Sequence, residues 1–325
     1  MWKVDSTIDA NGSSPVAEQI LDRWTCDSGS IRFFRSSANF VYVFRSEGKH
    51  HFLRFADSLE RGREAIAVEA DLLRWLKGTG IPVACPVASV SGNLVETVES
   101  GWGTFHAVVS PALDGAQFEI EELDHSAFRR WGAALGALHA ALERYPGAGS
   151  AKRPTWRDHL ESAALYLPDG ARALRQELIE TTLELAALPQ ARDTYGLIHF
   201  DFELDNLVWR DDAIGILDMD DCSYLWYAAD IAFALGDLFE ENTDGDDARL
   251  LAFVQGYSEH RPVDEHLASR IPLFRRLGDL VKYARVVRAA DLIVGPEHPE
   301  WLRDLSQRLE DRASTYRASI EGRRT

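Results

Sequence analysis

Cysteine, basic residues and long apolar runs are all scarce in this sequence. The three cysteines, Cys26, Cys85 and Cys222, are isolated, so they favour a reducing cytoplasm over a disulfide framework or a cysteine metal site. The 35 lysine and arginine residues face 52 aspartate and glutamate residues, and the formal net charge of −17 argues against a nucleic-acid partner. No apolar run reaches the roughly 18 residues of a membrane span, and the first residues lack the pattern of a signal peptide. We expect a cytoplasmic monomer or homodimer with no membrane partner.

The densest group of potential catalytic residues lies in the sequence LIHFDFELDNLVWRDDAIGILDMDD. His199, Asp201 and Asn206 occur there in the order His-x-Asp-x-x-x-x-Asn, and Asp218 ends an apolar run at 214–217. Phosphoryl transfer needs an acceptor hydroxyl held in line and metal ions that neutralise charge on the transferred group. An aspartate can receive the hydroxyl proton, and amide and carboxylate oxygens are ligands that Mg²⁺ prefers. The pattern therefore predicts a phosphotransfer site; the alternative is chance, because the chain is rich in acidic residues.

This stretch resembles the aminoglycoside phosphotransferase and choline kinase family, the small-molecule branch of the kinase-like fold. Members of that family carry a His-Gly-Asp-like triplet, an asparagine five residues after its Asp, and an Ile-Asp-Phe/Trp-like metal element. An Asp-Ala-Gly-like turn follows and leads into a helix with a Tyr-Asp-Leu-Ala-like sequence. The corresponding segments here are His199-Phe200-Asp201, Asn206, Leu217-Asp218-Met219, Asp221-Cys222-Ser223 and Ala229-Asp230-Ile231-Ala232.

The resemblance implies a fold, a nucleotide and a metal. The fold is α+β and protein-kinase-like, with two lobes: a small antiparallel β-sheet lobe and a larger, mostly helical lobe. Residues 1–110 would form the N-lobe, which covers the nucleotide, and residues 111–325 the C-lobe, which holds the catalytic loop and the acceptor site. The nucleotide is expected to be ATP, with GTP not excluded, and the metal Mg²⁺.

The resemblance also implies a role for each motif residue. Asp201 takes the role of the catalytic base, and Asn206 and Asp218 bind the metal ions. His199 and Asp230 are expected to be structural, supporting the catalytic loop through hydrogen bonds.

The N-terminal part has the pattern of short strands separated by turns, at 31–35, 40–45 and 51–55. The segment Ser28–Asn39 takes the position of a phosphate-covering loop, but it contains neither GxGxxG nor a Gly-Lys-Ser/Thr element. In the third strand the family usually places a lysine that binds the nucleotide phosphates, and this chain has Arg54. An arginine can contact phosphates and a carboxylate together, although its geometry differs from that of lysine.

A helix is predicted over Glu64–Lys77, where apolar residues recur at helical spacing and Gly-Thr-Gly follows. Glu69 in this helix is the expected ion-pair partner of Arg54, and Glu64 is the second choice. The alternative for Glu69 is an ordinary solvated charge on a helix surface.

An apolar strand at 105–109 precedes a proline-containing segment that we interpret as the hinge between the lobes. The adenine ring is expected to contact backbone groups of this hinge, at Ser110, Pro111 and Ala112. Beyond the hinge the sequence predicts mostly helices, at 128–142, 156–188, 226–258, 264–292 and 298–320.

Acidic residues are concentrated between Asp193 and Leu250, where Arg210 and Arg249 are the only basic residues. A cleft lined with carboxylates concentrates cationic molecules. We therefore expect a small amine-bearing acceptor, such as an aminoglycoside or other antibiotic, an amino sugar, choline or homoserine. The candidate acceptor-binding residues are Glu203, Asp205, Asp221, Asp237 and Glu240.

Two other interpretations stay open at this level. Arg54 in place of lysine, together with the glycine-poor covering loop, is also compatible with a non-catalytic relative that binds a nucleotide or small molecule. The sequence Asp218-Met219-Asp220 is compatible with a phosphatase that uses Asp218 as a covalent nucleophile beside Mg²⁺. The phosphatase interpretation leaves the His-x-Asp-x-x-x-x-Asn motif without a role, and Cys222 stands where such enzymes usually have threonine.

Overall fold

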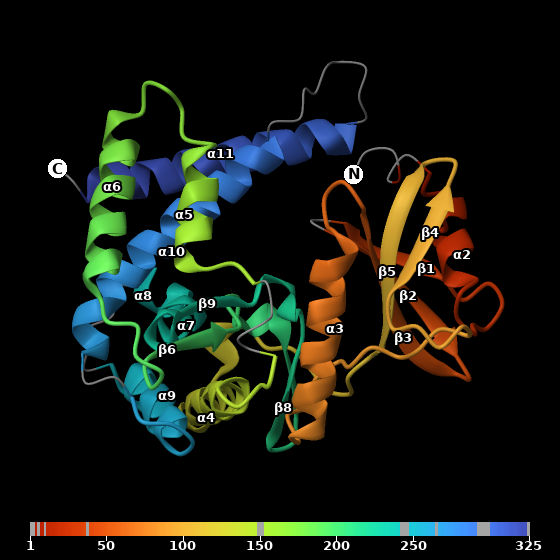
Figure 1. Cartoon of the computed structure of the whole chain (residues 1–325), viewed down its shortest axis with the longest axis horizontal. Helices are drawn as coiled ribbons and strands as arrows, with labels where there is room; N and C mark the ends of the chain where they lie inside the picture. Colours follow the sequence, from red (N-terminus) through yellow and green to blue (C-terminus); the bar gives the residue numbers. More distant parts are fainter. Residues whose placement is uncertain are drawn as a thin grey trace.

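The structure is a computed structural model, in which a five-stranded sheet lies beside a larger, mostly helical part (Figure 1). None of the helices among the described residues is long and apolar enough to cross a membrane. The structure describes residues 4, 7–9, 11–36, 39–147, 153–240, 247–263, 266–290 and 300–323.

The N-terminal sheet is antiparallel and has the strand order β1-β2-β3-β5-β4. The strands that the sequence predicts at 31–35, 40–45 and 51–55 correspond to the first three. The hairpin between β2 and β3 turns at Glu47 and Gly48, which both have positive φ. The strands are β1 (Arg32–Ser36), β2 (Phe40–Ser46), β3 (Lys49–Asp57), β4 (Glu96–Ser100) and β5 (Gly103–Pro111).

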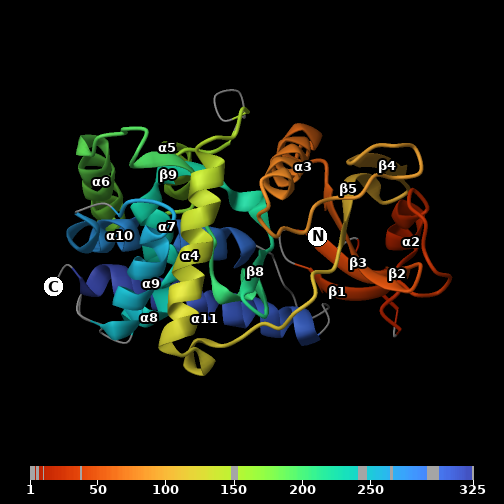
Figure 2. The same ribbon diagram turned by 90° about the horizontal axis from the view of Figure 1, so that it is seen from below.

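The two faces of the sheet are covered by different helices, because successive side chains of a strand point to opposite faces and the central strands carry apolar residues on both. Tyr42 and Leu53 point to one face and pack against α2 (Pro15–Leu21). Val108 points to the other face and packs against Ile66 of α3 (Arg63–Gly78). Helix α3 therefore lies between the sheet and the helical part, as two perpendicular views show (Figures 1 and 2).

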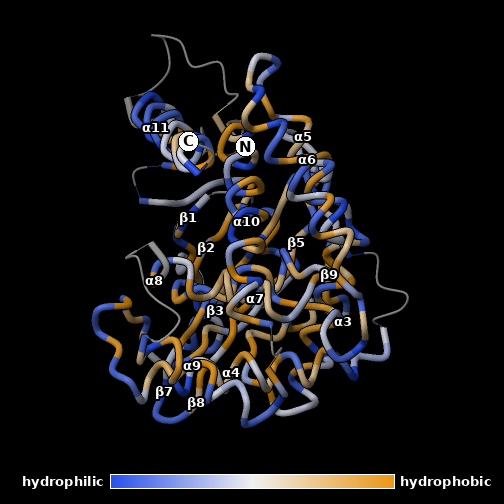
Figure 3. Tube along the Cα trace, turned by 90° about the vertical axis from the view of Figure 1, so that its left-hand side faces the viewer, coloured by the Kyte–Doolittle hydropathy of each residue, from blue (hydrophilic) through white to orange (hydrophobic). Residues whose placement is uncertain are grey.

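The helical part is built around one continuous apolar core. Helices α4 and α9 approach very closely, because Gly132 packs against the backbone of Phe253 and a Cβ atom there would lie 1.9 Å from its carbonyl oxygen. Hydrophobic segments gather at the centre, whereas α11 is mostly hydrophilic (Figure 3). The helices are α4 (His125–Leu142), α5 (Trp156–Ala164), α6 (Arg172–Ala187), α7 (Tyr227–Ala234), α8 (Gly236–Glu240), α9 (Ala248–Ser258), α10 (Leu267–Ala290) and α11 (Glu300–Gly322).

Two short antiparallel pairs, β6–β9 and β7–β8, position the sequence motifs. The loop at 199–206 connects β6 to β7, and the segment at 217–222 connects β8 to β9. The backbone N–H of Leu217 donates to the carbonyl oxygen of Asn206 at 2.9 Å, so the two connections lie against each other. The strands are β6 (Tyr195–Ile198), β7 (Leu207–Arg210), β8 (Ala213–Ile216) and β9 (Ser223–Trp226).

Candidate active site

The candidate catalytic loop, residues 199–206, is held in place by a buried carboxylate on α7. Asp230 accepts hydrogen bonds from the backbone N–H groups of His199 at 2.8 Å and Phe200 at 2.9 Å. The ring of His199 is fully buried; its Nε2 donates to the carbonyl oxygen of Leu217 at 2.8 Å, and its Nδ1 accepts from the backbone N–H of Asp201 at 3.2 Å. Since both ring nitrogens are engaged, His199 is structural, in agreement with the sequence-based expectation.

A buried histidine in turn orients Asp230. Burial lowers the pKa of His139, although its contact with Asp230 opposes that shift, so the ring is neutral at pH 7. Its Nε2 donates to the Asp230 carboxylate at 2.9 Å, and its Nδ1 accepts from the hydroxyl of Tyr257 at 2.9 Å. The sequence pointed to a structural role for Asp230 but did not reveal that His139 of α4 contacts it, or that Tyr257 of α9 in turn contacts His139.

Phe200 occupies the position where the family has glycine, and its backbone explains that preference. Its φ of 77° lies in the left-handed region that side chains with a Cβ atom rarely adopt. The ring is held by stacking on His159 of α5, with 4.3 Å between ring centroids, and by contact with Phe233 of α7. Packing of the ring therefore offsets backbone strain immediately before Asp201.

Asp201 and Asn206 face each other across the catalytic loop. The side-chain amide of Asn206 donates to both the carbonyl oxygen and the Oδ2 atom of Asp201, each at 2.9 Å. Burial and the charge of Glu203 raise the pKa of Asp201, which improves its capacity to accept a proton. Among the described residues no donor reaches the amide oxygen of Asn206, which leaves that oxygen available to a hard cation.

Asp218 follows β8 and is held by two arginines from the sheet. Its Oδ2 atom lies 3.0 Å from Nη2 of Arg35, and its Oδ1 atom lies 3.1 Å from Nη1 of Arg54. Burial and the nearby charge of Asp220 raise the pKa of Asp218 to about 6, although both arginines oppose that shift. The Asp218 carboxylate is a hard oxygen ligand suited to a divalent cation. In this structure its two oxygens are paired with guanidinium groups instead.

Arg54 and Glu69 form the ion pair that the sequence predicts. Nη2 of Arg54 lies 2.5 Å from Oε1 of Glu69, whose side chain is almost fully buried. Arg61, in the loop before α3, is a second partner of Glu69, at 3.4 Å. Glu69, the first choice over Glu64, is therefore confirmed as an ion-pair partner of Arg54. Helix α3 is thus fastened to β3 at the position where phosphates are expected.

Asp220 is a site residue whose partners sequence analysis missed. It pairs with Arg61 and accepts a hydrogen bond from the side chain of Asn39 at 2.9 Å. Burial opposes ionisation, but Arg61 and Arg54 outweigh it and lower the pKa of Asp220. The carboxylate therefore carries its charge and ties the segment after β8 to the sheet, which disfavours the phosphatase interpretation, where Asp220 would stand free beside Asp218.

The residues expected to form the hinge lie at and just after the end of β5. Ser110 pairs with Phe52 and Pro111 with His51 in the β3–β5 ladder. The backbone N–H of Ala112 donates to the carbonyl oxygen of His50 at 3.0 Å, and proline has no N–H. Neither Pro111 nor Ala112 therefore offers a free N–H to an adenine ring here.

Two of the candidate acceptor-binding acids pair with cations of α10. Glu203 pairs with Lys282 of α10 at 2.7 Å, and its charge, together with that of Asp205, contributes to raising the pKa of Asp237, for which partial burial is the main cause. Asp221 pairs with Arg285 of α10 at 2.7 Å, and its charge, like that of Glu203, contributes to raising the pKa of Asp201, for which burial is the main cause. The side chain of Glu240 lies outside the described part of the chain. The cations of α10 are the feature that sequence analysis missed.

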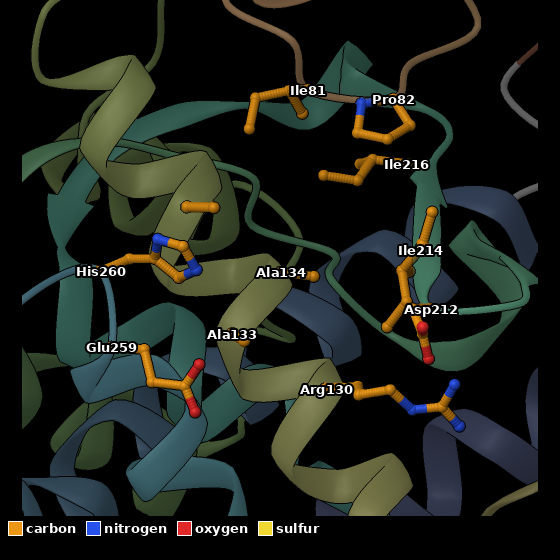
Figure 4. Close-up of a pocket in the computed structure, with 12 residues that line it drawn as sticks. Ile81, Pro82, Arg130, Ala133, Ala134, Asp212, Ile214, Ile216, Glu259 and His260 are labelled. Carbon is orange, nitrogen blue, oxygen red and sulfur yellow. The ribbon is translucent and has the colours of Figure 1, made fainter.

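A hollow of about 400 Å³ lies between α4 and β8 (Figure 4). Ile214 and Ile216 form one side, and Ala133 and Ala134 lie opposite. None of the site residues predicted from the sequence lines it, so the candidate active site is the polar region between the sheet and the catalytic loop.

The donor set suits a metal that is shared with a ligand. The described residues contain no group of three or more His, Cys, Asp or Glu side chains that could hold a metal ion by itself. Mg²⁺ usually takes one or two protein oxygens and completes its shell with phosphates and water. Asn206 and Asp218 fit that pattern.

Several known proteins with similar sequences are named as kinases. The chain is 27% identical to an amicoumacin kinase of Bacillus subtilis (strain 168) over 310 residues, which cover 90% of this chain and 92% of the relative. It is 29% identical to a homoserine kinase of Caulobacter sp. (strain K31) over 215 residues, which cover 63% of this chain and 64% of the relative.

The fold is also shared with a solved structure. An amicoumacin kinase in complex with AMP-PNP and Ca²⁺ superposes with a TM-score of 0.82 at 24% identity, over 99% of this chain and 96% of that one. This confirms the two-lobed kinase-like fold that the sequence predicts. A model of the phosphotransferase enzyme family matches residues 30–266, which is more than half of the chain, and the protein therefore belongs to that family of small-molecule kinases.

Proposed function

We propose that this enzyme transfers the γ-phosphoryl group of Mg·ATP to a hydroxyl group of a small, amine-bearing molecule. The observation that carries the proposal is the convergence of Asp201, Asn206 and Asp218 from two adjacent loops, opposite the Arg54–Glu69 pair of the sheet. Residues 1–110 would cover the nucleotide, and residues 111–325 would supply the catalytic loop and the acceptor site.

Asp201 would act as the catalytic base. Its Oδ2 atom is held by Asn206 at 2.9 Å, and the backbone around it is fixed by Asp230. The carboxylate can orient the acceptor hydroxyl in line with the γ-phosphorus and take its proton as the new O–P bond forms. The raised pKa of Asp201 lies closer to neutral pH, where a general base is most effective.

The nucleotide phosphates would be held by both lobes. Asn206 and Asp218 would bind the metal, which neutralises charge on the β- and γ-phosphates when bound. Arg54 would contact the phosphates while Glu69 keeps its guanidinium in place. The arginine fork can bind a carboxylate and a phosphate oxygen at once, which supports a catalytic enzyme over a nucleotide-binding relative that has lost activity.

The amine preference is supported by the group formed by Glu203, Asp205 and Asp237. Partial burial is the main cause of the raised pKa of Asp237; the charges of Glu203 and Asp205 add to the shift, and Lys282 opposes it. An acceptor ammonium group placed there would relieve like-charge repulsion. Homoserine, the substrate for which one set of relatives is named, is an amino alcohol and fits this requirement.

A panel assay tests this proposal. Formation of ADP or GDP from the Mg²⁺ complexes of ATP and GTP would be followed with amino alcohols, homoserine, choline, aminoglycosides, amicoumacin and sugars. Each amino alcohol would be matched with the diol that has the same carbon skeleton. We expect nucleotide consumption with ATP that depends on the acceptor, a phosphorylated product in the mass spectrum, and a higher kcat/KM for the amine of each pair. Higher values for the diols would contradict the amine preference.

A further inference from the structure

Arg35 lies on the same face of the sheet as Arg54 because β1 contains a bulge. Arg32 pairs with Val43, but the register shifts at the bulge so that Arg35, rather than the preceding residue, lies opposite Val41. Val41 in turn pairs with Arg54 on β3. Arg35 and Arg54 therefore belong to one row across the sheet, and both guanidinium groups reach Asp218.

The two arginines differ in how firmly they are held. Arg54 has an 18% exposed side chain and is anchored by Glu69 in addition to Asp218. Arg35 has a 49% exposed side chain, and among the described residues Asp218 is its only hydrogen-bond and ion-pair partner. A cation that takes the Asp218 carboxylate leaves Arg54 with an anionic partner and Arg35 without one.

We propose that Arg35 is a second phosphate-binding residue, which occupies the Asp218 carboxylate in the nucleotide-free enzyme and moves to the terminal phosphates of the bound nucleotide. This inference rests on the proposed phosphotransfer function. The guanidinium group forms paired, charge-assisted hydrogen bonds to phosphate as readily as to carboxylate. It would supply positive charge beside a covering segment that lacks both a glycine-rich motif and a Gly-Lys-Ser/Thr element.

This arrangement predicts effects of opposite sign for one substitution. Arg35→Gln removes a cation that competes with metal for Asp218, so Mn²⁺ should bind more tightly in the absence of nucleotide, by at least about threefold. The same substitution removes a phosphate contact, so Mg·AMP-PNP should bind at least about tenfold more weakly. A purely structural role for Arg35 would not produce both changes.

The experiment measures both affinities without any acceptor. Mn²⁺ binding would be followed by electron paramagnetic resonance, and binding of Mg·AMP-PNP and of AMP by calorimetry. AMP lacks the terminal phosphates and should bind Arg35→Gln within about twofold of wild type, while Arg35→Lys should recover part of the AMP-PNP affinity. The matched control is Arg129→Gln in the helical part, because the Arg129 side chain is 51% exposed and its Nε atom pairs with the carboxylate of Glu259 at 2.7 Å. It should change neither affinity.

The outcomes separate this inference from the proposed function. Wild-type protein that binds Mg·AMP-PNP, together with an Arg35→Gln variant of unchanged affinity, would overturn the role of Arg35 and leave the phosphotransfer function intact. Equal weakening of AMP and AMP-PNP, or weaker Mn²⁺ binding in Arg35→Gln, would also overturn it. Wild-type protein that binds no nucleotide would overturn both proposals.

Discussion

Nε2 of His139 lies 2.9 Å from Oδ2 of Asp230, and both side chains are fully buried. Because the histidine is neutral, the pair contains one buried negative charge, which is offset by hydrogen bonds from the backbone of the catalytic loop. The carboxylate of Asp230 on α7 thus positions the loop through its backbone N–H groups.

Replacing Asp230 should therefore damage the loop more than an ordinary surface substitution. Asp230→Asn loses the charge that two backbone N–H groups and His139 share, and the amide can satisfy fewer of these donors. We expect a loss of about 3–5 kcal/mol in the free energy of unfolding, measured by urea denaturation, and a lower kcat. Asp169→Asn is the matched control, because Asp169 is fully exposed and forms one surface pair; it should stay within about 0.5 kcal/mol of wild type. Equal stability of the two variants would contradict this role.

Substitutions of Arg54 should separate charge from geometry. Lysine keeps the charge but has one nitrogen, so it cannot contact Glu69 and Asp218 through two arms of a fork as arginine does. Arg54→Lys should weaken Mg·AMP-PNP binding by a few-fold, whereas Arg54→Gln should weaken it by at least about tenfold. Calorimetry measures both affinities. Arg54→Gln with the affinity of wild type would show that the phosphates are bound elsewhere.

The positive φ of Phe200 predicts that replacing it with glycine costs less stability than replacing it with alanine. Removing the ring leaves a cavity, so both Phe200→Ala and Phe200→Gly should be less stable than wild type, by about 2–5 kcal/mol. Glycine relieves the strain of a positive φ while alanine retains it, so the glycine variant should be the more stable of the two by about 1 kcal/mol. Chemical denaturation of the pair decides this. The reverse order would mean that the backbone at this position is not strained.

Acid sensitivity should depend on His159. Burial and the charge of Arg285 lower its pKa to about 3 in the folded protein, whereas the unfolded chain has a value of about 6.5. Below about pH 6.5 the unfolded chain binds a proton that the folded protein does not, so stability falls as pH decreases towards 3. Between pH 7 and 5 wild type should lose up to about 2 kcal/mol more than His159→Gln.

Denaturation curves at several pH values provide that comparison. The glutamine amide can still donate to the hydroxyl of Ser223, which His159 contacts at 2.8 Å. Parallel losses in the two proteins would assign the acid sensitivity to other groups.

Much of this site follows from the sequence because it is built from local motifs. The His-x-Asp-x-x-x-x-Asn spacing and the resemblance to a family led to the loop, to Asp218 and to the Arg54–Glu69 pair. Contacts that join distant segments did not follow. Arg35 reaches Asp218 only because a bulge changes the register of β1, and Lys282 meets Glu203 only through the packing of α10. Such contacts depend on tertiary packing, to which the periodicity of one segment is insensitive.

The central claim is that Asp201 activates the acceptor hydroxyl without being required for nucleotide binding. The most direct test measures acceptor-dependent phosphoryl transfer and Mg·AMP-PNP affinity in Asp201→Asn, with Asp212→Asn, an exposed aspartate in the β7–β8 turn, as the control. We predict that Asp201→Asn lowers kcat by about 10²–10⁴-fold with an AMP-PNP affinity near that of wild type, and that Asp212→Asn changes neither. Phosphoryl transfer at the wild-type rate in Asp201→Asn would contradict the account.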